Sequence, residues 1–410
     1  MRDEFSQMKI YLRLCVMREK EILEQIRENF QGIVVDAYIF ETFSSAISSF
    51  LGLMNKPYIL DPSTYRFQLE TITEHMEKRW YENLVSLYGL EHHLSVTDRL
   101  EPSSMNDAEL KEFAEKVLNY QRSAAPERFL NDLGIMQYLG EGPTELPAPE
   151  ILLPPYFIAD SAKSLGINLN LIRTSLELKN DNEKIYGVAA IDRELLFNPK
   201  NVDILADAYS KLDVDGYMLW IPNYQEVNED SLLIEGVIKL AQNLAKYSNG
   251  KPVMNMFGGY LSLVLSSLGV FEGYMQGLGI ANHRNPYGES GPAPFRYYMP
   301  ILHKMISLDN AENLVGMSDV FRCKCPVCHD RESLSEMSVS ELLKHIGYCI
   351  EQEVQECTDT TLKKIVGKLE SDYKATQNVG KRNPGWSDQI GGWNKHLRIW
   401  STTLSRMFLP

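Results

Sequence analysis

Residues 184–222 read KIYGVAAIDRELLFNPKNVDILADAYSKLDVDGYMLWIP, and this stretch decides the fold class. Two apolar runs, 184–192 and 215–222, flank a segment with helical periodicity at 201–212. A strand, a helix and a second strand in this order form a parallel unit, because parallel neighbours need a long crossover. Both runs are almost continuously apolar, which is typical of parallel strands with helices on both sides.

The same alternation continues in both directions along the chain. Helical segments at 230–247 and 260–268 separate the later runs, and residues 6–30 are expected to form an amphipathic helix. No G-x-G-x-x-G or Walker motif follows a strand, so the usual argument for a nucleotide-binding doubly wound sheet fails. We therefore predict an α/β fold, a (β/α)8 TIM barrel. The other expected strands lie within 33–40, 56–61, 151–160, 168–177, 251–259 and 271–277.

A cysteine-rich motif, FRCKCPVCHDRESLSEMSVSELLKHIGYC, spans residues 321–349. Closely spaced thiolates on a tight turn and a histidine on a later helix make a closed Cys3His set, which is typical of structural zinc. His329 follows the third cysteine too closely to turn back easily, whereas Cys349 competes as an alternative fourth ligand. The remaining interpretation is a group of ordinary buried thiols. The predicted Zn²⁺ ligands are Cys323, Cys325, Cys328 and His345.

Composition narrows the class of protein. The chain has 410 residues, 44% of them hydrophobic, and a net charge of −14, which argues against a surface that coats nucleic acid all over. No run approaches the roughly 20 apolar residues of a membrane span, so no membrane partner is expected. The amino-terminal stretch carries acids and lacks a signal-peptide core. With six cysteines, three of them clustered, a cytoplasmic location is expected.

Residues 363–406 combine basic side chains with Trp386, Trp393 and Trp400. Such a mixture favours contact with phosphates and bases. A helix that packs its tryptophans on the barrel and keeps its lysines in water explains the pattern equally simply. We expect three parts, namely a barrel at 1–315 with a helical insertion near 70–140, a zinc-binding subdomain at 316–358, and a helical, basic-aromatic extension at 359–410.

Several motifs together resemble the tRNA-guanine transglycosylases over roughly residues 50–355. CKCPVC (323–328) and LLKHIGY (342–348) are similar to the family's zinc region, and KPYILDPSTYRFQ (56–68) to its "PILTDSGGFQ" segment. LDVDGYMLWIP (212–222) resembles "GFDGYAVGG", KIYGVAAIDREL (184–195) resembles "LFGIVQGG", and the order along the chain agrees. The resemblance implies a zinc-bearing barrel that exchanges guanine for a 7-deazaguanine in DNA or tRNA.

Residue by residue, the resemblance implies that Asp61 takes part in base exchange and that Asp160 hydrogen-bonds the incoming base. Either aspartate can instead cap a helix, since both lie where a strand gives way to a helix. The backbone at Gly258 and Gly259 is expected to approach the ligand closely. These residues follow expected strands, where barrel enzymes place their sites.

The chain departs from the family at the nucleophile. Tyr274 takes the place of the attacking aspartate and is expected to contact the substrate, while Glu272 is on the same strand face, two residues earlier. We therefore expect Asp61 and Glu272 to be catalytic and to face one pocket. The alternatives are a non-catalytic nucleic-acid-binding subunit that forms a homo- or heterodimer, and an unrelated zinc-stapled hydrolase.

Overall fold

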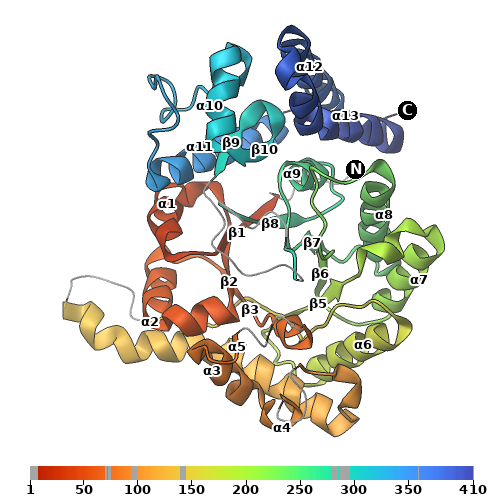
Figure 1. Ribbon diagram of the computed structural model, residues 1–410. Helices are drawn as coiled ribbons and strands as arrows, with labels where there is room; N and C mark the ends of the chain where they lie inside the picture. Colours follow the sequence, from red (N-terminus) through yellow and green to blue (C-terminus); the bar gives the residue numbers. More distant parts are fainter. Residues whose placement is uncertain are drawn as a thin grey trace.

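Eight parallel strands form a nearly closed barrel in the order β3-β2-β1-β8-β7-β6-β5-β4 (Figure 1). The computed structural model describes residues 8–69, 72, 75–94, 99–138, 145–278, 284–286, 296–358 and 360–409, with only the backbone of 133–138. The predicted TIM barrel is confirmed. The strands are β1 Lys9–Leu14, β2 Gly32–Asp36, β3 Tyr58–Asp61, β4 Ile151–Leu152, β5 Lys184–Ala190, β6 Gly216–Trp220, β7 Val253–Asn255 and β8 Gly273–Gly277.

No backbone hydrogen-bond ladder joins β3 to β4 within the described residues. Instead, side chains that follow β3 bond the backbone that follows β4. After the short β4, the chain runs past a 3-10 turn at Thr64–Gln68. The Thr64 hydroxyl donates to the Tyr156 carbonyl and accepts from the Tyr156 amide, both at 2.8 Å. Gln68 makes the same exchange with the backbone of Ile158, at 3.4 and 2.9 Å. These bonds satisfy backbone groups that would otherwise be buried without partners.

Helices surround the barrel, as βαβ connections require (Figure 1). The long helix α5 packs against α2 and α6, over the side where β3 and β4 lie. With α3 and α4 it makes up the helical region predicted near 70–140. The helices up to this point and around the barrel are α1 Lys20–Gln25, α2 Ala37–Met54, α3 Arg79–Tyr88, α4 Glu91–Leu94, α5 Asp107–Tyr138, α6 Ala162–Glu177, α7 Pro199–Ser210, α8 Ser231–Tyr247 and α9 Tyr260–Ser267.

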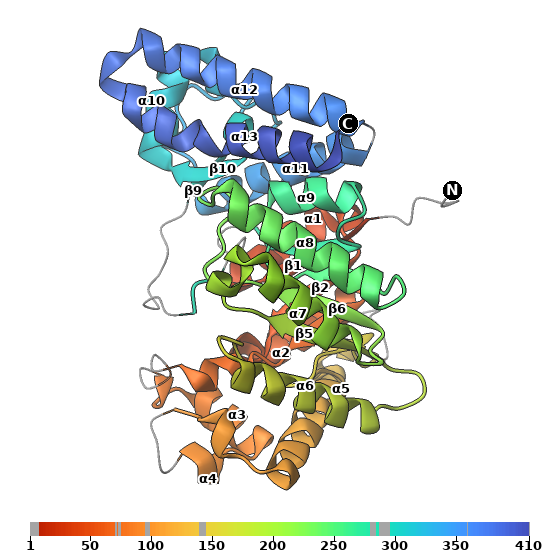
Figure 2. The ribbon, with the colours of Figure 1, turned by 90° about the vertical axis from the view of Figure 1, so that its right-hand side faces the viewer.

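The remaining elements lie on the opposite side of the barrel from α3–α5 (Figures 1 and 2). An antiparallel pair, β9 Arg296–Met299 and β10 Lys304–Ser307, is followed by α10 Leu308–Met317 and α11 Val339–Thr358. Then α12 Leu362–Arg382 and α13 Ser387–Phe408 form a helical hairpin. Trp400 is buried, and its indole N–H donates to the Glu226 carbonyl at 3.0 Å. This tryptophan packs on the barrel, as expected if the extension places its tryptophans against the barrel and its lysines in water.

Two predicted elements were wrong. Residues 9–14 are strand β1, not part of a helix, because Leu12 and Leu14 face the outer helices while Tyr11 faces the barrel interior. A strand buried on both faces has no clear period, and its apolar residues happened to fit helical spacing. Residues 168–177 lie in helix α6, not in a strand. Ser161 caps this helix, and its buried positions recur at helical spacing.

Candidate functional site

Three neighbouring strands bring charged side chains together at their carboxyl ends. Arg13 comes from β1, and Asp36 and Asp61 are the last residues of β2 and β3, where they are partners in the strand register. One Arg13 nitrogen, Nη1, contacts Asp36 Oδ1 and lies 3.0 Å from Asp61 Oδ2. Active sites of TIM barrels lie at this end of the strands. We call this group, with Arg284, the mouth cluster.

Arg284 completes the mouth cluster. Its Nη2 lies 2.7 Å from Asp36 Oδ2, and its Nη1 donates to the Tyr65 hydroxyl at 3.0 Å. Burial alone would raise the pKa of Asp36, but the guanidinium groups of Arg284, Arg13 and Arg66 lower this pKa to about 2. Asp36 is therefore a carboxylate at neutral pH.

Asp61 is held by uncharged donors as well as by Arg13. The Tyr156 hydroxyl donates to Asp61 Oδ1 at 2.8 Å, and the Ser63 amide donates to the same oxygen at 2.9 Å. Burial and the nearby Asp61 raise the Tyr156 pKa well above its usual value, so this phenol keeps its proton. The hydrogen bonds fix the orientation of the Asp61 carboxylate.

Aromatic rings lie beside the mouth cluster. The Tyr65 and Trp220 ring centroids are 4.4 Å apart, and Trp220 and Phe257 are 5.7 Å apart. The Arg13 guanidinium sits 4.3 Å from the Phe257 ring centroid. The indole nitrogen of Trp220 is buried and has no hydrogen-bond partner among the residues that the structure describes. Rings and an unused donor suit a flat, polar molecule.

Asp160 lies in solvent where the chain leaves this end of the barrel. Its neighbour Ala159 bridges to Ile191, just after β5, and the Asp160 carboxylate accepts from the Ser164 hydroxyl at 2.9 Å. Ser161 is the capping residue of α6. The aspartate is thus accessible to a ligand, but it also assists the start of the helix.

Glu272 lies at the other end of the barrel, so the prediction that it faces Asp61 was wrong. It precedes β8, and its carboxylate is 2.5 Å from the ammonium of Lys9, the first residue of β1. Its amide donates to the carbonyl of Val253, the first residue of β7, at 2.8 Å. The strands are parallel, so residues at their amino ends are separated from Asp61 by the full strand length.

Tyr274 also fails as a substrate contact, because its buried side chain belongs to the layer between strands and helices. Met275 is the residue of β8 that faces the barrel interior. Alternate residues of a strand point to opposite faces, so an alignment that is wrong by one residue assigns a side chain to the wrong face of the sheet. Burial raises the pKa of Tyr274 well above its usual value.

Gly258 makes room for the protein's own side chains, and Gly259 is the residue that precedes helix α9. A Cβ at Gly258 would lie 2.4 Å from Ser262 Oγ. Gly259 begins α9, whose amides at Leu261 and Ser262 each donate to the buried Glu226 carboxylate at 3.0 Å. This carboxylate occupies the amino end of the helix, where an anion is favoured. The close approach expected at these glycines is therefore, at Gly258, a contact with the protein's own side chains.

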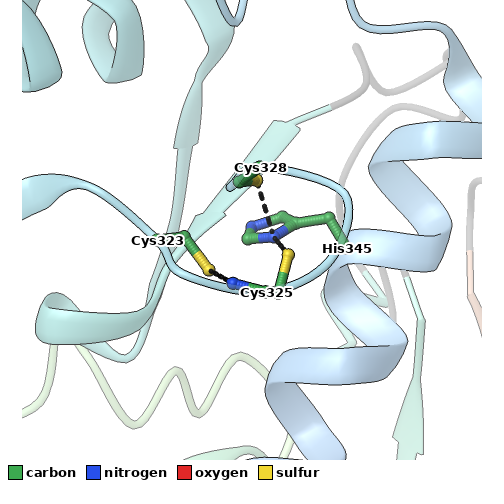
Figure 3. Close-up of side chains that lie close together, drawn as sticks. All are labelled: Cys323, Cys325, Cys328 and His345. Atoms are coloured by element: carbon green, nitrogen blue, oxygen red, sulfur yellow. Dashed lines mark hydrogen bonds between the residues drawn. The ribbon is translucent and has the colours of Figure 1, made fainter. Parts of the chain in front are cut away.

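The Cys3His prediction agrees with the structure. The donor atoms of Cys323, Cys325, Cys328 and His345 are buried and lie within 4.8 Å of one another (Figure 3). His345 Nδ1 is 3.4 Å from the sulfur atoms of both Cys325 and Cys328. A tetrahedral zinc ion with bonds of about 2.0–2.3 Å separates sulfur from nitrogen by about 3.5 Å. The donor set therefore fits a tetrahedral ion.

Outer contacts orient the histidine. His345 Nε2 lies 2.7 Å from the Tyr298 carbonyl, so it carries the proton and leaves Nδ1 free to bind a metal. The Tyr297 ring stacks on the imidazole with centroids 4.2 Å apart. His329 is exposed, which removes it as a ligand. Cys349 remains close, with its sulfur 3.6 Å from His345 Nδ1 and 3.9 Å from Cys323 Sγ.

Sequence reasoning missed Arg13, Asp36, Arg284 and Trp220. Trp220 could have been found, because it lies near the end of the expected strand 215–222. Asp36 was hidden because it stands in the middle of the expected strand 33–40, whereas β2 ends at Asp36. Arg13 was hidden by the incorrect helix. Arg284 lies in the segment 251–285, which also resembles the family, but no role was assigned to it from the sequence.

No family model matches the chain, and no curated protein matches it in sequence. Among solved structures, orotidine 5'-monophosphate decarboxylase from Methanocaldococcus jannaschii, complexed with the inhibitor BMP, aligns at 14% identity with a TM-score of 0.34. The alignment covers 68% of this chain and 93% of that chain. A likeness of this size carries no argument about activity. Within the described residues, no helix is long and apolar enough to cross a membrane.

Proposed function

We propose that the chain is a zinc-stapled barrel that exchanges a guanine base in DNA or tRNA for a 7-deazaguanine. The observation that carries the proposal is the position of Asp61, a carboxylate at the carboxyl ends of the strands, beside aromatic rings and an unused indole donor. The Cys323, Cys325, Cys328 and His345 donors would hold Zn²⁺. A closed set of four protein ligands stabilises the fold and leaves no position for a reacting water.

Asp61 would act as the nucleophile in place of Glu272. Its carboxylate oxygen forms a bond to C1′ of the nucleotide while the bond from C1′ to guanine N9 breaks. The incoming 7-deazaguanine nitrogen then forms the new bond to C1′, and the ester bond to Asp61 breaks. The departing base takes up one proton and the incoming base releases one, so the exchange is balanced. Arg13 and Tyr156 would position the carboxylate.

Base exchange tests this proposal directly. Radiolabelled guanine or a 7-deazaguanine is incubated with the protein and with tRNA or DNA in separate reactions. Asp61→Asn should abolish incorporation, because an amide oxygen is a poor nucleophile. Glu272→Gln is the matched control and should retain incorporation, since Glu272 lies at the opposite end. Incorporation that survives Asp61→Asn, or that is lost in Glu272→Gln, would overturn the assignment.

A non-catalytic subunit is the second candidate, and one observation favours it. The oxygens of Asp36 and Asp61 are all engaged by the protein's own side chains or backbone. A carboxylate so occupied must lose a partner before it attacks C1′. Absence of exchange in the wild type with either nucleic acid, together with dimerisation with an active transglycosylase in analytical ultracentrifugation, would favour this candidate.

A further inference from the structure

A polar pocket lies away from the barrel mouth, lined by residues of the β9–β10 hairpin, α10 and α13. Figure 2 shows these elements at one end of the molecule. The pocket encloses about 280 Å³. The polar and aromatic side chains that line it are Arg296, Lys304, Ser307, Asn310 and Trp393. We call it the hairpin pocket. It shares no residue with the mouth cluster or with the Cys3His group.

The hairpin pocket carries positive charge without a compensating acid. Within the described part of the chain, neither Arg296 nor Lys304 has an ion pair or a side-chain hydrogen bond. Burial, and then the neighbouring Arg296, lower the pKa of Lys304. Two cations that line one pocket without a carboxylate beside them repel each other, whereas the chain as a whole is strongly acidic, with a net charge of −14. An anion bound between them would relieve this cost.

The hairpin pocket also offers a flat ring. Trp393 is half-buried, and its ring centroid lies 6.3 Å from that of Trp386. Ser307, whose hydroxyl caps α10 by accepting from the Asn310 backbone amide, and the Asn310 side chain also line the pocket. Inorganic phosphate would use only the two cations of the pocket. A nucleotide would use the cations and the ring, with its phosphate at the cations and its base against the ring.

We propose that the hairpin pocket binds one nucleotide of a single-stranded nucleic acid, with the phosphate between Arg296 and Lys304 and the base stacked on Trp393. This inference rests on the proposed function, because it gives the nucleic acid a contact outside the barrel. It also assigns a role to Trp393 of the basic-aromatic extension, whose presence the packing of Trp400 on the barrel does not explain.

Fluorescence anisotropy with a labelled single-stranded oligonucleotide, as DNA and as RNA, tests the inference. Arg296→Ala/Lys304→Ala should weaken binding at least about tenfold and reduce the slope of log affinity against log salt by about 0.7, the contribution of the one phosphate that the two cations neutralise. Trp393→Ala should weaken binding about tenfold, and Trp393→Phe should retain most of the affinity. Lys395→Ala removes an exposed charge from α13 outside the pocket and should change binding less than about twofold.

Several outcomes would overturn the inference. An unchanged affinity in the double variant would do so, as would an equal loss of affinity in Lys395→Ala. The same holds if the pocket binds inorganic phosphate but Trp393→Ala leaves oligonucleotide affinity unchanged. Failure of the wild type to bind the oligonucleotide would also contradict the inference. Thermal melting of each variant shows that the fold is retained. Asp61→Asn separates the two proposals, because it should lose base exchange and keep oligonucleotide binding. Pocket-dependent binding without any exchange would contradict the proposed function alone.

Discussion

Replacing Arg13 by methionine should destabilise the protein more than any surface substitution. Arg13, Asp36 and Asp61 are each 1% exposed, so the two carboxylates cannot gain water when the guanidinium is removed. Asp36 keeps Arg284 at 2.7 Å, but Asp61 has no other basic partner among the described residues. Removing one partner of a buried ion pair costs about 3–5 kcal/mol. We expect a loss of that size, a large part of a typical total of about 5–15 kcal/mol.

Urea unfolding measures this loss as a lower midpoint with an unchanged slope. Lys211→Met is the control, because Lys211 pairs with Asp207 on an exposed helix surface and should cost less than about 0.5 kcal/mol. Arg13→Met/Asp61→Asn should recover part of the stability, since the unpaired carboxylate is gone. A loss below about 1 kcal/mol in Arg13→Met would refute the buried ion network described here.

Three further predictions concern the metal centre, a buried acid and the closure of the barrel. Cys325→Ser should release the metal and lower the melting temperature of the protein. The control His329→Ala should keep one zinc per chain, as measured by elemental analysis. Equal zinc content in the two variants would count against the ligand set. Burial raises the pKa of Glu353 from 4.5 to about 8, so the folded state binds the extra proton and stability falls as pH rises between these values. Urea unfolding at pH 6 and pH 8 should show that Glu353→Gln removes this fall in the free energy of unfolding. An unchanged pH dependence in the variant would contradict the raised pKa of Glu353. Thr64→Val should cost about 1–3 kcal/mol in urea unfolding, because it leaves the Tyr156 amide and carbonyl unpaired; no measurable loss would show that these bonds do not close the barrel.

The barrel and the Cys3His cluster could be predicted because both leave local patterns. The runs at 184–192 and 215–222 became β5 and β6 around α7, and the spacing of Cys323, Cys325 and Cys328 is a property of one turn. Their convergence on His345 needed only one following helix. Local sequence therefore sufficed for these parts.

The mouth cluster could not be predicted as a whole, because it depends on strand register and direction. Arg13, Asp61 and Arg284 are far apart in sequence and meet only when the barrel closes. Glu272 could have been assigned correctly, because it lies near the start of the expected strand 271–277 whereas Asp61 ends its own strand, and parallel strands place these positions at opposite ends of the barrel. Which face of a strand a residue occupies, and which residues it meets on neighbouring strands, depend on register, which an apolar run does not mark.

The proposal that Asp61 attacks C1′ is tested most directly by trapping the covalent intermediate. The wild type is incubated with substrate nucleic acid, quenched in acid, digested and analysed by mass spectrometry. We predict a nucleotide ester on the peptide that contains Asp61, absent in Asp61→Asn and present in Glu272→Gln. An ester on another residue, or none while labelled base is being incorporated, would contradict the proposal.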